Sequence, residues 1–179
     1  MSTALNASSR PSREPVTLVD RFAVLDLTHQ QVFRHLTALR ELIDRLAVND
    51  VDEQARAIAQ AAFDFFETHA RQHHAEEEQK VFPALLNSGN EPLRQHVLRL
   101  QQDHGWLEQD WVELGPMLSS LAKDYSSVDL DMLREALEVF TALYTEHISL
   151  EELLIYPEAK RRAAVEEAAK KARLAGQAG

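Results

Sequence analysis

A His-x-x-x-Glu unit occurs twice in the chain, and each copy is followed six residues later by a proline. The two copies are His73-x-x-x-Glu77 with Pro83 and His147-x-x-x-Glu151 with Pro157. Positions four apart lie one above the other on one face of an α-helix, so each unit points an imidazole and a carboxylate in the same direction. This pair of ligand types suits iron, manganese or zinc.

The stretches that carry these units, and two further stretches, have apolar residues at alternating steps of three and four. That period is typical of helices in a bundle. The four stripes cover residues 25–46, 66–84, 93–118 and 130–154, and the second and fourth end at Ala84 and Leu154. Short loops between long helices predict an all-α protein, an up-down-up-down four-helix bundle.

Local signals set the expected boundaries of these helices. Asp52 and Asp129 are placed to cap the second and fourth helices. Gly115-Pro116 predicts a kink or an end in the third helix, and Pro157 an end or a bend in the fourth. We expect three parts: a polar, disordered N-terminal arm at 1–14, the bundle at 15–157, and a C-terminal helix or tail at 158–179 that is rich in Ala, Glu, Lys and Arg.

The composition excludes several classes of function. The chain has no cysteine, which rules out disulfides, thiolate metal sites and iron–sulfur clusters held by its own residues. A net charge of −10 argues against a nucleic-acid partner, which favours a basic face. No apolar run approaches the roughly 18 residues that span a membrane, and the N-terminus has no apolar signal sequence. We therefore expect a cytoplasmic monomer or homodimer that binds small molecules.

Each of the other two stripes is interrupted by one histidine, His29 in the first and His104 in the third. A single histidine on an apolar stripe is more often a hydrogen-bonded core residue, and a single His-x-x-x-Glu is common on solvated faces. Here the spacing repeats, since His29 precedes His73 by 44 residues and His104 precedes His147 by 43. Alternating helix directions then place all of these groups at a similar depth in the bundle.

Two carboxylates buried without partners would each cost several kcal/mol or be forced to protonate. A dinuclear metal centre removes this cost, because carboxylates can bridge two cations while imidazoles complete the ends. The predicted metal ligands are His29, His73, Glu77, His104, His147 and Glu151.

Four more residues have open roles. Glu108 lies four residues after His104, and His69 and His74 flank His73; each is either an additional ligand or a neighbour of the ligands. Tyr144 lies on the inward stripe one turn before His147, and it approaches the metal, donates a proton as a catalytic residue, or packs.

In combination these residues resemble the hemerythrin-like family, the HHE cation-binding domain, over about residues 18–157. The resemblance implies a non-haem diiron centre bridged by Glu77, Glu151 and an oxo or hydroxo group, although the ligands alone also suit manganese or zinc. Oxygen-carrying members have His-x-x-x-His on the third helix, whereas Glu108 stands four residues after His104 here. One imidazole fewer implies more open coordination and disfavours reversible oxygen carriage.

Three functions follow as hypotheses. The first is a diiron catalase- or peroxidase-like oxidoreductase of oxidative stress, which decomposes hydrogen peroxide or carries out O2-dependent redox chemistry. The second is a sensor, carrier or store that binds O2, NO or iron without turnover. The third is a helical adaptor that holds zinc or no metal.

Overall fold

The computed structural model describes residues 18–123 and 128–177, and the predicted N-terminal arm at 1–14 lies outside these ranges. All regular elements in the described ranges are helical. They are α1 (Leu18–Leu46), α2 (Glu53–Asp64), η1 (Phe65–Ala70), α3 (Arg71–Lys80), α4 (Phe82–Leu86), α5 (Glu91–Ala122), α6 (Leu130–Leu150), η2 (Glu151–Ile155) and α7 (Tyr156–Gln177), where η1 and η2 are π-helical. Within these ranges none of the helices has the length and apolar character needed to cross a membrane.

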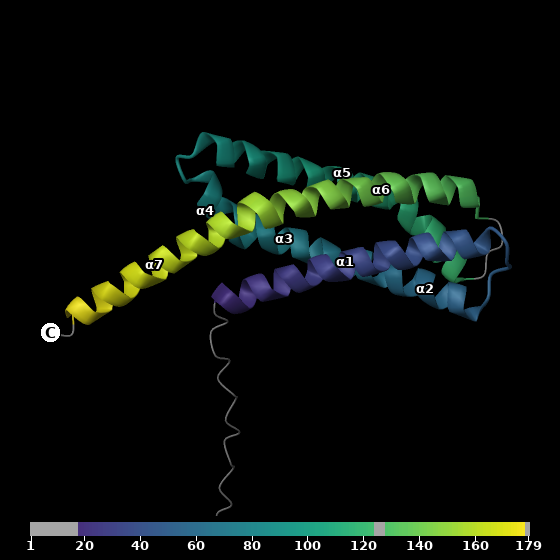
Figure 1. Cartoon of the computed structure of the whole chain (residues 1–179), viewed down its shortest axis with the longest axis horizontal. Helices are drawn as coiled ribbons and strands as arrows, with labels where there is room; N and C mark the ends of the chain where they lie inside the picture. The colour runs from purple at the N-terminus through teal and green to yellow at the C-terminus, as the bar shows by residue number, and fades with distance from the viewer. Residues whose placement is uncertain (1–17, 124–127, 178–179) are drawn as a thin grey trace, which may run out of the picture.

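The helices form four segments of alternating direction: α1, then α2 to α4, then α5, then α6 to α7 (Figure 1). α1 packs against α2 and α6, and α5 packs against the same two helices. α7 continues the line of α6 past the end of the bundle (Figure 1). The predicted all-α, up-down-up-down bundle with a C-terminal helix is therefore confirmed.

Side chains that accept hydrogen bonds from the backbone begin three of the helices. The Asp52 carboxylate accepts a hydrogen bond from the backbone N–H of Ala55 at 2.8 Å, and Asp129 accepts from two N–H groups at the start of α6. Both predicted caps are confirmed. Asn90, which the sequence analysis did not single out, accepts from the N–H of Leu93 at the start of α5. These caps satisfy donors that have no partner within the helix.

The prolines do not end their helices. α5 continues past Pro116, and α6, η2 and α7 continue past Pro157 as one uninterrupted helical stretch. A proline has no N–H to donate, and its ring crowds the carbonyl four residues earlier. The wider π-helical turn of η2 ends two residues before Pro157, so the hydrogen-bond pattern has already shifted ahead of the ring.

The π-helical turn also changes which residues enter the core after Glu151. Leu154, expected to face inward, is 45% exposed, whereas the next residue, Ile155, is fully buried. A π turn holds more residues than an α turn, so the inward stripe moves on by one position. A break at Val81, where α3 ends and α4 begins, has the same effect: Ala84 is exposed and Leu85 is buried. Because of the shift, Tyr156 lies inside the bundle.

The core consists of two apolar clusters with a polar layer between them. The larger cluster includes Leu39, Leu114 and Phe140, and the smaller one includes Leu25 and Phe82. On each segment the polar residues fall between members of the two clusters, and all of them are buried. They are His29, His73, Glu77, Asp103, His104, His147 and Glu151. The bundle thus encloses imidazoles and carboxylates at one level, with apolar packing on both sides.

Candidate metal centre

The six residues predicted as metal ligands come together in this polar layer. Their donor atoms form two groups, and within each group the donor atoms all lie within 4.8 Å of one another. One group is His29, His73, Glu77 and Glu151, and the other is Glu77, His104, His147 and Glu151. Both groups contain the same two glutamates. The layer therefore offers two adjacent positions for a cation, each with two imidazoles of its own and two carboxylates shared with its neighbour.

The separations between donor atoms match those of ligands around a common ion. The Nε2 atoms of His29 and His73 are 3.1 Å apart, and the Nε2 atoms of His29 and His147 each lie 3.2 Å from an oxygen of Glu151. Glu77 oxygens lie 3.5 Å from Nε2 of His73 and of His104. Two ligands about 2.1 Å from a metal and about 95° apart are about 3.1 Å from each other.

Unpaired polar atoms give a second test of whether this layer fits a metal. Within the described residues, every buried side-chain nitrogen or oxygen without a hydrogen-bond partner belongs to this layer or to His74, which follows His73 in the chain. These atoms are His73 Nδ1, His74 Nε2, Glu77 Oε2, Asp103 Oδ2, His104 Nε2, His147 Nδ1 and Nε2, and both carboxylate oxygens of Glu151. Such atoms are rare and costly in folded proteins. A cation that accepts several lone pairs at once removes most of this cost, so the residues fit a metal.

A carboxylate faces the outer nitrogen of three of the histidines. The pairs are His29 Nδ1 with Glu152 Oε1 at 3.0 Å, His104 Nδ1 with Glu78 Oε1 at 2.8 Å, and His147 Nδ1 with Asp103 Oδ2 at 3.8 Å. In the two shorter pairs a neutral imidazole donates its Nδ1–H to the carboxylate. The Nε2 lone pair then points into the layer, which is the tautomer that binds a metal.

The sequence analysis did not assign these carboxylates, although the repeat contained a signal for two of them. In each copy the glutamate of the His-x-x-x-Glu unit is followed directly by a second one, giving Glu77-Glu78 and Glu151-Glu152. Glu78 and Glu152 leave the inward face of their own helix and each contacts a histidine of a neighbouring segment, His104 and His29 respectively. The duplicated Glu-Glu pair was thus a pattern that could have identified them.

Without a metal, these buried groups perturb one another's protonation. Burial and the nearby charge of Glu151 raise the pKa of Glu77 to about 7. Burial alone would lower the pKa of His147, but Glu151 and Asp103 outweigh it and raise the value to about 10. Burial and repulsion from His29 lower the pKa of His73 to about 3. The metal-free site therefore holds protons at neutral pH on groups that a metal needs deprotonated.

We expect the metal affinity to fall as the pH is lowered. In the metal-free protein Glu77 holds a proton below about pH 7 and His147 below about pH 10, so binding a cation must release these protons. The apparent affinity should drop roughly tenfold per pH unit for each proton displaced, and more steeply below about pH 7, where Glu77 contributes. Titration with cobalt(II) in a weakly buffered solution that contains a pH indicator measures both the apparent affinity and the number of protons released. An affinity independent of pH, with no proton release, would contradict these assignments.

Glu108 and His69 lie outside the cluster. The Glu108 carboxylate forms an ion pair with Arg71, whose guanidinium also contacts Glu67 at 2.6 Å. The His69 side chain is exposed, and its Nδ1 lies 3.0 Å from the hydroxyl of Thr68. Neither side chain reaches the donor groups described above.

Replacing Glu108 with glutamine should leave the metal content unchanged. The carboxylate already has Arg71 as its partner at the surface, so its loss removes an exposed ion pair and no metal ligand. Elemental analysis of purified wild-type and variant proteins checks this expectation. A loss of one metal ion per chain in Glu108→Gln would show that Glu108 swings inward to bind.

The two tyrosines near the site differ in what they contact. The Tyr144 ring packs among Phe66 and Phe140, 6.4 Å from the ring of His147, and burial raises its pKa. The Tyr156 hydroxyl donates a hydrogen bond to Glu77 Oε1 and lies 3.2 Å from His29 Nε2. The sequence analysis noted Tyr156 only as part of the Tyr-Pro motif. The structure places its hydroxyl, rather than that of Tyr144, against a shared glutamate.

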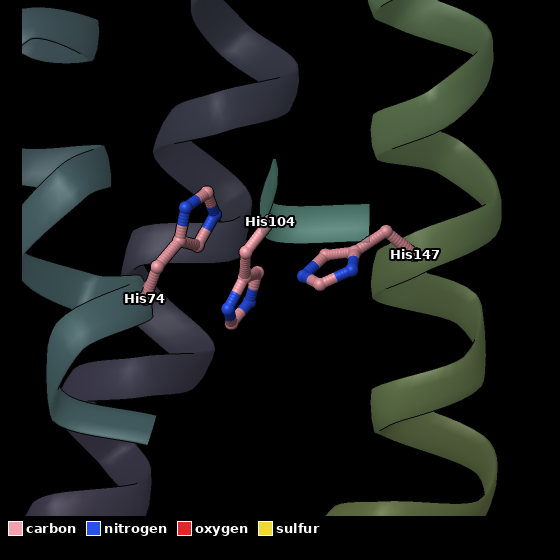
Figure 2. A group of neighbouring side chains, drawn as sticks. All are labelled: His74, His104 and His147. Carbon is pink, nitrogen blue, oxygen red and sulfur yellow. The ribbon is translucent and has the colours of Figure 1, made fainter. Parts of the chain in front are cut away.

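His74 lies close to one of the two donor groups. Its ring stacks on that of His104, and the donor atoms of His74, His104 and His147 form a third group within 4.8 Å of one another. Figure 2 shows the three rings side by side, each from a different helix, with His104 between the other two. The structure therefore brings His74 to the edge of the layer.

Four antiparallel helical segments that bury histidine and glutamate at one level define a metal-binding helical bundle. The family model of the hemerythrin HHE cation-binding domain matches residues 20–159, and the chain belongs to this family. The match covers all six predicted ligands and confirms the resemblance found in the sequence. Neither a curated protein nor a solved structure matches the chain.

Proposed function

We propose that the protein holds two iron ions bridged by Glu77 and Glu151, and that it reacts with a small oxidant. The favoured reaction is decomposition of hydrogen peroxide, with O2-dependent redox chemistry as a related possibility. The observation that carries the proposal is that both donor groups contain the same two glutamates, which are completely buried. Shared carboxylates between adjacent positions are the usual means of holding two cations in a helical bundle.

The donor chemistry supports iron. The groups offer imidazole nitrogens and carboxylate oxygens without any thiolate, a set that suits iron, manganese and zinc alike. Membership of a cation-binding family that typically binds iron favours iron among these. A bound iron pair supplies the electrons that peroxide chemistry exchanges, and zinc has no redox chemistry to offer.

The protein's own residues control protons and water at this site. The apolar clusters on both sides keep the layer dry, which governs redox potential and access. Cleavage of the peroxide O–O bond to water consumes protons, and the Tyr156 hydroxyl holds a buried proton at Glu77 Oε1. Tyr156 is therefore the residue that we assign to hold and deliver a proton at this carboxylate.

Replacing Tyr156 with phenylalanine should slow peroxide decomposition by about 10- to 100-fold while the iron content stays the same. The expected loss lies at or below the low end of general-acid contributions. The matched control is Tyr144→Phe, which removes a hydroxyl from the apolar side of the layer. Oxygen evolution from iron-loaded proteins measures both. Equal rates in Tyr156→Phe and wild type would refute the assignment.

Peroxide turnover itself is tested with the wild-type protein and His73→Ala. The imidazole of His73 belongs to only one donor group, so its removal should impair one position without unfolding the bundle. We expect iron-loaded wild type to evolve oxygen from peroxide well above the rate of the variant. If the two rates are equal, the catalytic form of the proposal fails.

Binding without turnover is the second candidate, and the small cavity beside the site is compatible with a gas as the ligand. The cavity beside His74 and Tyr144 has a volume of about 10 Å³, enough for about one water molecule. Such a confined space suits O2 or NO better than a larger substrate. This alternative predicts a stable change of the visible spectrum when O2 or NO is added to the reduced, iron-loaded protein, without consumption of the gas.

A further inference from the structure

We propose that His74 is an additional ligand, a fifth imidazole, for the metal ion held by His104 and His147. This inference rests on the proposed metal pair. It differs from the six-ligand prediction because it makes the two metal positions chemically unequal.

Three distances place His74 beside His104 and His147. Its ring lies 4.1 Å from that of His104, with an angle of 15° between the planes, and 5.6 Å from the ring of His147. One nitrogen from each of the three residues lies within 4.8 Å of the other two. The rings come from α3, α5 and α6, so three segments of the bundle converge here (Figure 2).

The Nε2 atom of His74 lacks a hydrogen-bond partner among the described residues, although it is enclosed by protein. A buried imidazole nitrogen normally finds a donor, an acceptor or a metal. Stacking on His104 satisfies the face of the ring and leaves this nitrogen unpaired. The Nε2 atoms of His104 and His147, the two residues that complete the group, also lack a hydrogen-bond partner among the described residues. A shared cation would satisfy all three nitrogens together.

Helix geometry explains how neighbouring histidines can serve different metals. Consecutive residues on an α-helix point about 100° apart around its axis. His73 therefore reaches His29, with 3.1 Å between the Nε2 atoms, whereas His74 reaches His104 on the other side. The position four after His104 is taken by Glu108, whose carboxylate is paired with Arg71 at the surface. His74 on α3 supplies the imidazole that α5 does not.

The proposed ligand makes the two positions unequal. The position of His104 and His147 would have three imidazoles, whereas that of His29 and His73 has two and lies next to the Tyr156 hydroxyl.

Cobalt(II) substitution of the full-length protein tests the proposal without any activity assay. The visible absorption of cobalt(II) reports coordination number, and titration gives the affinity of each position. The variants are His74→Ala and His74→Phe, and the control is His69→Ala, which removes an exposed histidine from η1, directly before α3. His74→Phe keeps a ring that can stack on His104 but has no nitrogen, so it separates ligation from packing.

We expect both His74 variants to bind one of two cobalt ions more weakly by more than the roughly 10- to 100-fold that loss of a ligand's hydrogen-bond partner causes. We also expect both to show a changed spectrum. Added imidazole should restore the wild-type spectrum in His74→Ala, and His69→Ala should match wild type throughout. A wild-type spectrum and affinity in His74→Phe would overturn the proposal, because stacking alone would then account for the residue. If wild type binds fewer than two cobalt ions, the proposal of a metal pair fails, and the His74 proposal fails with it. If wild type binds two ions and His74→Phe is unchanged, only the His74 proposal fails.

Discussion

Replacing Glu77 with glutamine is expected to reduce bound iron from two ions to fewer than one per chain. Glu77 belongs to both donor groups, so its change affects both positions at once. An amide has one neutral oxygen and bridges cations poorly, whereas a carboxylate has two charged ones. By contrast His29→Ala, which alters a residue of one group only, should retain about one ion. Elemental analysis after iron loading compares the three proteins.

The expected loss in Glu77→Gln does not come from unfolding. Burial and Glu151 already raise the pKa of Glu77 to about 7, so the metal-free side chain is protonated in part at neutral pH. The amide oxygen can still accept the hydrogen bond of Tyr156. Circular dichroism should therefore match wild type, and Glu76→Gln serves as the control for loss of one carboxylate on the same helix. Two ions per chain in Glu77→Gln would exclude it as a bridge.

Removal of the metal should lower the melting temperature by roughly 10–15 °C. The metal-free layer leaves the oxygens of Glu151 and the inner nitrogens of His104 and His147 buried without hydrogen-bond partners among the described residues. A ligand at about 1,000 times its dissociation constant stabilises the folded state by about 4 kcal/mol. For a chain of this size each kcal/mol shifts the melting temperature by about 2–4 °C.

Calorimetry of the protein before and after chelation, and after metal is added back, measures this shift. The matched control is Glu77→Gln, whose melting temperature should not respond to added metal. The prediction fails if wild type melts at the same temperature in all three states. Such a result would mean that the bundle tolerates its buried carboxylates and imidazoles without a cation.

Periodicity in the sequence was sufficient to place the bundle and its polar layer. A strict alternation of three- and four-residue steps put His29 between Leu25 and Val32, and the structure has both leucine and valine buried on either side of the histidine. The repeated His-x-x-x-Glu units lay on the same kind of stripe. These inferences depend only on the regular geometry of an α-helix, which holds along most of each segment.

The inferences that failed lie where helix geometry departs from the regular one. Counting in steps of three and four assumes a regular α-helix throughout, so it placed Leu154 inside and gave no role to Tyr156. Because of the π-helical turn at 151–155, Leu154 is exposed and Tyr156 is buried. Steps of three and four residues do not reveal a π turn, because it is a rare single-turn interruption of an α-helix.

Contacts between segments were also beyond the sequence. Glu108 stands at a regular spacing from His104, but its carboxylate turns to Arg71 on a neighbouring helix. His74 points about one quarter turn away from His73, yet it meets His104 because α5 lies on that side. Which long side chain pairs with which neighbour depends on how the helices are placed around the bundle, and one sequence does not determine this.

Metal content together with the visible spectrum, recorded before and after addition of peroxide, tests the central claim most directly. The account predicts about two iron ions per chain and charge-transfer bands of a bridged iron pair, which change when peroxide is added and which Glu77→Gln lacks. Fewer than one iron ion per chain after growth with added iron would contradict it. Stoichiometric zinc with no visible bands would contradict it equally, and would favour a structural role for the bundle.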